Sequence, residues 1–206
     1  MAQVHINNVM VQNNPAPALS PVQFEITFEC FKDLPGTFDW KIIYLGSPTD
    51  SQYDQIIDEF EMNDLKAGVL SFMTDSNPPN FSKIPPNEIL GTTAILVSAS
   101  YEGQEFFRVG YYVHNEYDDP NMELPPQPIL ERIRRNIMSE NPRIMRFEIE
   151  WAKREGNSGL NHQILQQSLE VTGGDPFQKS SGVLQQLEKM NYSYGMFGSS
   201  TEQFQK

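Results

Sequence analysis

Short apolar runs separated by turn residues recur along the chain as far as residue 151, and most of the 15 prolines fall between them. Strand-forming residues and alternating apolar positions fill these runs. In chain order they are VHINNVMV (4–11), VQFEITFECF (22–31), DWKIIYL (39–45), GVLSFMTD (68–75), TTAILVSASY (92–101), EFFRVGYYVHNEY (105–117) and IMRFEIEW (144–151). Seven or more short strands at this spacing predict an all-β fold, a sandwich of two sheets.

Two connecting segments predict helical structure. Residues 48–62, PTDSQYDQIIDEFEM, favour a short helical turn. Residues 128–139, PILERIRRNIMS, predict a short amphipathic helix, because apolar side chains recur at helical spacing, namely Ile129, Leu130, Ile133 and Ile137. The sequence ENPR then ends this helix, because a residue that precedes proline disfavours helical backbone.

The composition changes after Trp151. Residues 152–206 are rich in Gln, Ser and Gly and contain few β-branched residues. This composition predicts one domain over residues 1–151 and a disordered tail over residues 152–206. Within the tail, HQILQQSLE and SGVLQQLEKM could form transient helices on a partner.

The stretch TTAILVSASYEGQEFFRVGYYV predicts two strands joined as a hairpin. Matching apolar faces require a loop with an odd number of residues, because side chains alternate across a strand. A three-residue loop, Tyr101–Gly103, with Gly103 at positive φ meets this requirement. The resulting register pairs Leu96 with Arg108, Ala94 with Gly110 and Thr92 with Tyr112.

The two faces of this hairpin differ in character. The odd positions are expected in the core: Thr93, Ile95, Val97, Ala99, Phe107, Val109, Tyr111 and Val113. The second face mixes small, apolar and aromatic side chains around one cation: Thr92, Ala94, Leu96, Phe106, Arg108 and Tyr112. In DWKIIYL the same alternation buries Trp40, Ile42 and Tyr44 and turns Lys41, Ile43 and Leu45 outward. A contiguous exposed apolar patch with an aromatic residue and an arginine is typical of a binding site. A loop or helix of the protein that covers this face is the alternative.

The net charge is −12, and it lies entirely in residues 1–151, because the tail holds five acidic and five basic residues. An acidic surface repels nucleic acid and attracts basic partners. Many proteins are acidic without such a partner, so charge alone leaves both interpretations open.

Catalytic patterns are weak. His5, His114 and His162 lack metal-ligand spacing, and Cys30 lies in an apolar strand where a buried core side chain is expected. The acidic stretch YDQIIDEFEMND does not match a calcium loop and is interpreted as a solvated face. The sequence therefore predicts an interaction module rather than an enzyme, without metal or cofactor. A single cysteine excludes a disulfide framework and favours a reducing, intracellular setting. No apolar run approaches 18 residues, and the N-terminus lacks a secretory signal pattern, so no membrane contact is expected.

Five longer motifs resemble one known family. They are NNPAPALSPVQFEITFECFKDL, DWKIIYLGS, YDQIIDEF, GQEFFRVGYYVHNEY and NPRIMRFEIEW. Together they are similar to the anti-silencing function histone chaperones over about residues 1–151, whereas the tail lies outside the resemblance. The resemblance implies an immunoglobulin-like β-sandwich that binds one histone H3–H4 dimer, blocks its assembly into a tetramer and delivers it for nucleosome assembly in the nucleus, acting as a monomer without ATP.

The resemblance also implies two contacts with histones. The H3-binding face carries over onto Leu45, Asp54, Glu88, Thr92, Ala94, Leu96, Arg108, Tyr111 and Tyr112. Strand parity places the ring of Tyr111 on the core side, where it would act mainly as support. The H4 tail adds as a strand at NPRIMRF, with contacts at Pro142, Arg143 and Met145 and a pocket completed by Ile6. Thr92 and Ala94 stand where the family usually has larger β-branched residues, so the fit to H3 could differ.

A third implied contact is with basic hairpin segments of downstream chaperones, which the family binds through acidic residues just before a Trp. Here the corresponding residues are Gly36 and Thr37, which carry no charge. Asp33, Asp39 and Asp58 could substitute for them. The alternative from a different class is an immunoglobulin-like scaffold that binds another peptide by edge-strand addition.

Overall fold

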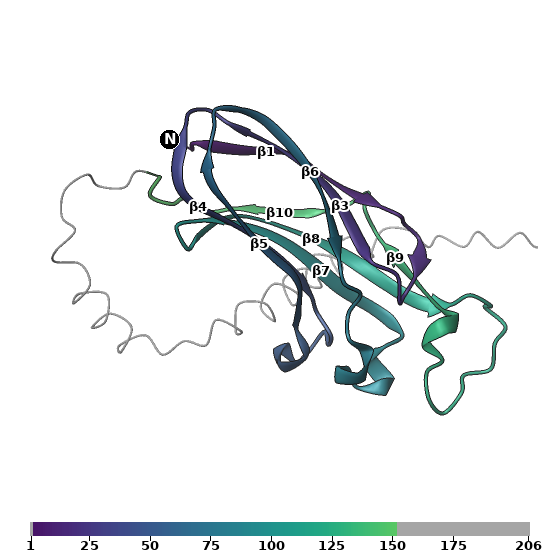
Figure 1. The fold of residues 1–206 in the computed structure, drawn as a ribbon. Helices are drawn as coiled ribbons and strands as arrows, with labels where there is room; N and C mark the ends of the chain where they lie inside the picture. The colour runs from purple at the N-terminus through teal and green to yellow at the C-terminus, as the bar shows by residue number, and fades with distance from the viewer. Residues whose placement is uncertain (1, 152–206) are drawn as a thin grey trace, which may run out of the picture.

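The computed structural model of the chain describes residues 2–151 (Figure 1). These residues form two antiparallel sheets that pack as a sandwich, which confirms the all-β prediction. The smaller sheet has the order β1 (Val4–Gln12), β3 (Val22–Cys30) and β6 (Gly68–Ser76). The larger sheet has the order β2 (Ala16–Pro17), β9 (Ile133–Ile137), β8 (Gln104–Tyr117), β7 (Gly91–Tyr101), β4 (Leu34–Tyr44) and β5 (Gln55–Leu65), and β10 (Arg143–Arg146) pairs with β8.

The core lies between the sheets, and strand alternation fills it. Every second residue of β3 is buried, from Val22 to Cys30, because that face packs on the larger sheet. Aromatic rings dominate the centre, where Phe28 stacks on Phe38 with ring centroids 5.5 Å apart and packs against Trp40 at 5.9 Å. Trp40, Ile42 and Tyr44 are all buried, as the alternation predicts.

The connections contain single turns of 3-10 helix: η1 (Ser51–Tyr53), η2 (Phe81–Lys83), η3 (Pro86–Glu88) and η4 (Leu130–Arg132). The turn expected within residues 48–62 is therefore present as η1, but the rest of that segment forms β5. The helix predicted over residues 128–139 is wrong: η4 leads directly into strand β9. No helix among residues 2–151 is long and apolar enough to cross a membrane.

Strand β9 replaces the predicted helix because Ile133, Arg135 and Ile137 are all buried at a spacing of two. The Arg135 guanidinium is buried, and it donates hydrogen bonds to the carbonyl oxygens of Ser20 at 2.9 Å and Pro21 at 3.0 Å. These two carbonyl groups offset the cost of burying a cation. The same burial lowers the pKa of Arg135 from its usual value.

The β7–β8 hairpin keeps the predicted faces but not the predicted register. The observed pairs are Leu96 with Gly110, Ala94 with Tyr112 and Thr92 with His114, two residues away from the expectation. The turn has two central residues, Glu102 and Gly103, both at positive φ (50° and 74°), as hairpin turns of this length require. An irregularity follows, because Ser100 pairs with Glu105 but Ala99 pairs with Phe107. Phe106 is thus the extra residue of a β-bulge.

The bulge also changes the face on which Phe106 lies. The expectation placed it on the second face with Arg108, whereas the structure buries it in the main core, where it packs against Phe38 and Trp151. The predicted disordered tail, residues 152–206, lies outside the described residues, so that boundary stays a prediction.

Candidate functional site

A second, smaller apolar cluster lies on the face of the larger sheet that points away from the sandwich core. We call it the outer-face cluster; it consists of Ile43, Leu45, Ala94, Leu96, Tyr112 and Met145. Its side chains come from four neighbouring strands, because the register aligns Ile43 with Leu96 and Ala94 with Tyr112. Sequence alternation predicted Ile43, Leu45, Ala94, Leu96 and Tyr112 on this outer face, and the structure brings these five together. Met145 was not predicted there.

The exposure of this cluster differs from the expectation of an open apolar patch. Leu45, Ala94 and Leu96 are 1%, 0% and 1% exposed, so Leu45 is not turned out to solvent as predicted. They are covered by the half-buried side chains of Ile43, Tyr112 and Met145. The side chains within reach of a partner on this face are therefore Ile43, Tyr112 and Met145.

Ile56 extends this surface and was missed by the sequence analysis. It is 53% exposed and pairs with Ile43 across β4 and β5. The acidic residues around Ile56 indicated a solvated segment, so the sequence analysis did not predict the edge strand β5 there. Its apolar side chain at that position widens the candidate contact area.

Arg108 lies beside the cluster and is held by a carboxylate. Its Nε and one terminal nitrogen each donate to Glu105, both at 2.6 Å, in a bidentate pair with 12% and 27% of the two side chains exposed. In a regular strand, residues three apart would point to opposite faces. The Phe106 bulge removes that offset and lets Glu105 orient the guanidinium. The structure thus supplies a fixed cation next to Met145, its register partner on β10.

Asp54 and Leu45 are linked through Gly46. A Cβ atom on Gly46 would lie 2.3 Å from the carbonyl oxygen of Tyr53, so only glycine permits this close approach. Asp54 is the residue that ends η1, and its N–H donates to the carbonyl of Ser51 at 3.1 Å. The approach therefore holds Asp54 near the end of the outer-face cluster.

The remaining predicted residues of this surface have different positions. Thr92 is exposed on β7, and its hydroxyl lies 3.2 Å from Nδ1 of His114, a contact that the predicted register did not include. Glu88 belongs to η3, shortly before β7. Tyr111 lies in the core, as parity predicts: its ring stacks on Phe24, its hydroxyl donates to the carbonyl of Val9 at 2.8 Å, and burial raises its pKa to about 12.

The predicted strand-addition site has an open edge. Strand β10 pairs with β8 along one edge and has no strand on its other edge within residues 2–151. Pro142 and Arg143 are half-buried, while Met145 points to the outer-face cluster. Ile6 is buried and lines a cavity on the other side of β10, so the four predicted residues divide between two sides of this strand.

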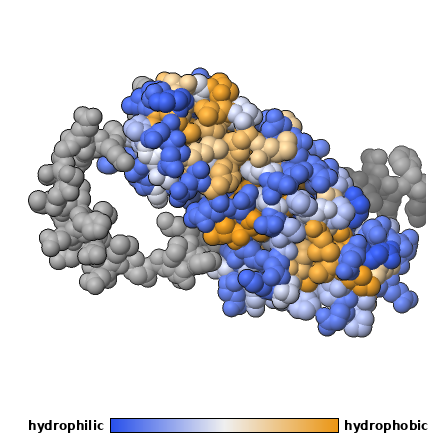
Figure 2. Space-filling view, viewed as in Figure 1, coloured by the Kyte–Doolittle hydropathy of each residue, from blue (hydrophilic) through white to orange (hydrophobic). Residues whose placement is uncertain are grey.

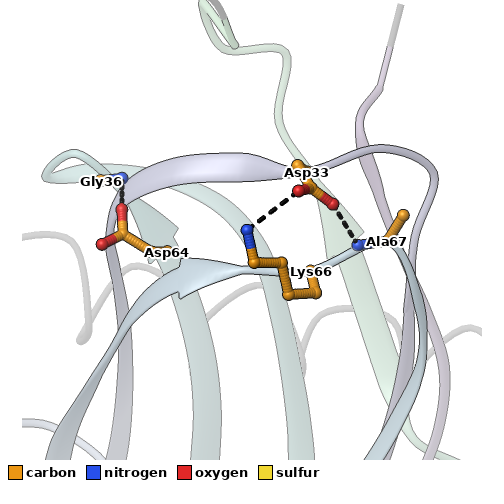
Figure 3. Close-up of polar contacts among 5 residues, drawn as sticks. All are labelled: Asp33, Gly36, Asp64, Lys66 and Ala67. Carbon is orange, nitrogen blue, oxygen red and sulfur yellow. Dashed lines mark hydrogen bonds and ion pairs between the residues drawn. The ribbon is translucent and has the colours of Figure 1, made fainter.

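The region expected to contact downstream chaperones also contains two acidic residues that the sequence analysis did not name, Asp64 and Glu102. Figure 3 shows Asp64 accepting a hydrogen bond from the N–H of Gly36 at 3.2 Å, and Asp33 between Lys66 and Ala67. The N–H of Thr37 donates to Glu102 at 2.8 Å. The Ala67 hydrogen bond and then Lys66 lower the pKa of Asp33. Acidic side chains from β5 and the hairpin turn thus flank the uncharged Gly36 and Thr37.

The other two residues proposed for that contact lie apart from each other. Asp39 shares its face of β4 with Lys41, on the outer side of the sheet, whereas Asp58 accepts a hydrogen bond from the buried hydroxyl of Ser76 at 3.1 Å.

The side of the sandwich between β5 and β6 is apolar. Figure 2, drawn from the same side as Figure 1, shows this apolar surface. Its partly buried side chains are Phe60, Met62, Leu70 and Phe72.

Cys30 is buried at 2% exposure, as predicted for a core side chain. Burial, and next the charge of Asp33, raises the pKa of its thiol, which disfavours the reactive thiolate. Among residues 2–151, no three His, Cys, Asp or Glu side chains gather in a way that could hold a metal ion.

The fold and these surfaces define an immunoglobulin-like β-sandwich with an apolar outer face and an open strand edge. The model of one protein family, described as ASF1 like histone chaperone, matches residues 1–152, and the chain belongs to this family. It is 50% identical over 157 residues to Histone chaperone asf1 of Aspergillus oryzae, covering 75% of this chain and 55% of that protein. It is 48% identical over 153 residues to Histone chaperone asf1b of Xenopus tropicalis, covering 73% of this chain and 76% of that protein. It is 46% identical over 153 residues to Histone chaperone asf1 of Drosophila melanogaster, covering 73% and 70%. The chain thus spans about half the length of the Aspergillus relative.

Proposed function

We propose that this protein is a histone chaperone that binds one histone H3–H4 dimer, prevents two dimers from forming a tetramer and delivers the dimer for nucleosome assembly and disassembly. The observation that carries the proposal is the outer-face cluster with Arg108 fixed at its side, in a chain of the ASF1-like family. The proposed role needs no catalysis, cofactor or ATP, and it places the protein in the nucleus as a monomer.

The outer-face cluster is the proposed contact for H3. A helix of H3 would pack its apolar side on Leu45, Ala94, Leu96 and Tyr112, with Ile43 and Ile56 at the margin. Arg108 and Asp54 would pair with charged residues of that helix, and Thr92 and Glu88 would add polar contacts. Tyr111 would support β8 from the core rather than touch H3. Ala94 is smaller than the β-branched residue usual in the family, and Tyr112 and Met145 pack against the cluster to which it belongs.

The open edge of β10 is the proposed contact for the H4 tail. An extended peptide that adds to an unpaired strand gains main-chain hydrogen bonds, and side-chain pockets then give specificity. Pro142, Arg143 and Met145 lie on or next to that edge, and Ile6 belongs to the adjoining cavity. The same open edge would also accept another extended peptide, which is the alternative function of an immunoglobulin-like scaffold.

Selective binding of the histones tests the proposed function. We expect the full chain to bind H3–H4 with a stoichiometry of one dimer and to leave H2A–H2B unbound, measured by sedimentation and fluorescence titration. The affinity should fall as salt rises, because the acidic domain attracts a basic partner. Equal binding of both histone pairs would contradict the proposal and favour the scaffold alternative.

The side of the sandwich between β5 and β6 is the proposed contact for basic hairpin segments of downstream chaperones. The apolar residues of this side would pack against the apolar side chains of such a hairpin. The carboxylates of Asp64, Glu102 and Asp33 would attract its basic side chains. Gly36 is unsuited to an added acid, because its φ is +103° and a Cβ would lie 2.1 Å from Oε1 of Glu102. Thr37 carries no such restriction.

We therefore expect Thr37→Asp to tighten binding of a basic hairpin peptide by about threefold to tenfold, because each added rim charge contributes modestly in water. Fluorescence anisotropy with the full chain measures this change, and Thr37→Ser serves as the matched control. If Thr37→Asp leaves the affinity unchanged while the peptide binds, this end of the sandwich does not contact the basic segment.

A further inference from the structure

A cavity of about 500 Å³ adjoins the open edge of β10. Its walls come from the start of β1, the start of β8 and the segment that follows β10, with Val4, Ile6, Phe106, Phe107, Phe147 and Trp151 as apolar lining. Arg146 lines it from β10 itself, with its guanidinium 5.9 Å from the ring centroid of Phe107. Figure 1 shows β10 beside β8, the strand with which it pairs.

Strand β10, beside the cavity, has an exposed edge to which a further strand could add. Ile144 is 50% exposed and shares its side of β10 with Arg146, because alternate residues point the same way. The next residue along, Phe147, is 43% exposed and still donates its N–H to the carbonyl of Phe106 at 2.9 Å. An added strand would cover this apolar surface and place every second side chain toward the cavity.

Trp151, the last residue that the structure describes, lines the cavity. Its ring stacks on Tyr101 with centroids 5.6 Å apart and meets the edge of Phe106 at 4.9 Å. The backbone just before it is also fixed, because Gln104 and Glu150 exchange two hydrogen bonds of 3.4 and 3.3 Å. Trp151, the last described residue, is therefore held in the lining of the cavity.

One stretch of the residues after Trp151 has the sequence of a strand. Residues 191–196 alternate the small residues Asn191, Ser193 and Gly195 with Tyr192, Tyr194 and Met196, and Phe197 follows as a further aromatic residue. No charged residue occurs between Lys189 and Glu202. Tyrosine and phenylalanine favour strands, and period-two alternation predicts a strand with one apolar face. Such a face gains stability only when another surface covers it.

We propose that residues 191–197 of this chain add as a strand to the open edge of β10 and place the side chains of Tyr192, Tyr194 and Met196 in the adjoining cavity. The apolar walls suit tyrosine rings, and the Arg146 guanidinium suits a ring face. The sequence between Trp151 and the segment, residues 152–190, has 39 residues. A flexible chain of that length spans roughly 35 Å, which is ample to return to the cavity that Trp151 lines. Such a tether gives an effective concentration on the order of millimolar, so even a weak contact is populated.

The contact would regulate the strand edge. If the proposed function holds, the segment and the H4 tail compete for the same edge of β10, so occupation by the segment lowers the apparent affinity for H3–H4. This consequence rests on the proposed function, whereas the intramolecular contact itself does not.

Amide hydrogen exchange of the full chain without histones tests the contact. We expect the variant Tyr192→Ser/Tyr194→Ser/Phe197→Ser to exchange the amides of residues 143–147 at least threefold faster than the wild type. The matched control is Ile164→Ser/Leu165→Ser/Leu169→Ser, which makes three apolar-to-serine changes elsewhere in the tail and should exchange like the wild type. All these changes lie outside the sandwich, so loss of folding does not complicate the result. Equal exchange in wild type and the 192/194/197 variant would overturn the proposal.

Two further readings separate the remaining outcomes. Protection that grows with protein concentration would show that a second copy supplies the segment and would overturn the intramolecular contact, whereas constant protection supports it. In a histone titration, the 192/194/197 variant should bind H3–H4 about threefold to tenfold more tightly than the wild type. If neither chain binds H3–H4, the proposed function fails, and the exchange result still decides the contact.

Discussion

Arg108→Glu should lower the affinity for H3–H4 by about 100-fold or more. Arg108 is nearly buried beside the outer-face cluster, and its guanidinium forms a bidentate pair with Glu105. The substitution removes the cation and places a second carboxylate next to Glu105 at the proposed H3 contact. Truncating or reversing one partner of a buried charge pair at an interface costs about 2–5 kcal/mol, mostly as faster dissociation. Fluorescence titration and stopped-flow dissociation measure both quantities.

Arg132→Glu is the matched control. Arg132 also pairs with a carboxylate, Asp118 at 2.7 Å, but this pair is about half exposed and lies in the β8–β9 connection, away from the outer-face cluster. It makes the same charge change in the whole protein, so the long-range electrostatic attraction to a basic partner rises equally in both variants. We expect Arg132→Glu to bind within about threefold of the wild type. Equal loss in both variants would mean that the proposed surface is not the contact for H3–H4.

The β7–β8 hairpin shows what the sequence predicted and why the prediction was incomplete. Parity assigned the faces correctly at most positions because the core needs one continuous apolar face on each strand. A two-residue turn at Glu102 and Gly103 changes the pairing by one residue, and the bulge at Phe106 changes it by one more. Together the two changes shift the strand pairing by two residues, so each side chain beyond the bulge stays on the face that alternation predicted. Nothing in the local pattern distinguishes this solution from a three-residue loop without a bulge.

The predicted helix over residues 128–139 failed for a different reason. Ile133 and Ile137 are compatible with helical spacing, and the residue between them in strand spacing is Arg135, which normally faces solvent. The distant carbonyl groups of Ser20 and Pro21 make its burial possible, and no pattern within the segment reports them. Tertiary hydrogen bonds therefore decided the secondary structure.

The acidic end of the sandwich could not have been predicted from its own segment. Gly36 and Thr37 lack charge, so the sequence indicated a weakened contact. The carboxylates of Asp64 and Glu102 reach the same backbone from residues far along the chain. Only the fold brings these groups together, whereas most of the outer-face cluster could be predicted because alternation along single strands reports which side chains share a face.

Phe28→Ala should destabilise the protein by about 3–5 kcal/mol. The Phe28 side chain is 0% exposed and contacts three other rings, with centroids 5.5 Å from Phe38, 5.9 Å from Trp40 and 6.3 Å from Phe72. Removing it loses the transfer free energy of the ring and leaves a cavity that a sandwich of paired strands cannot easily close. Urea unfolding of the full chain, followed by the fluorescence of the buried Trp40, measures the free energy of unfolding.

Phe31→Ala supplies the comparison within the same stretch of chain. Phe31 follows β3 and is 56% exposed, so the same chemical change should cost less than about 0.5 kcal/mol. Equal losses at the two positions would contradict the alternation that places Phe28 between the sheets. The difference also bears on function, because Phe38 and Trp40 lie on the inner face of β4 while Ile43, on its outer face, belongs to the proposed H3 surface. Phe28→Ala should therefore weaken histone binding only to the extent that it unfolds the sandwich, whereas Arg108→Glu should weaken binding in a protein that remains folded.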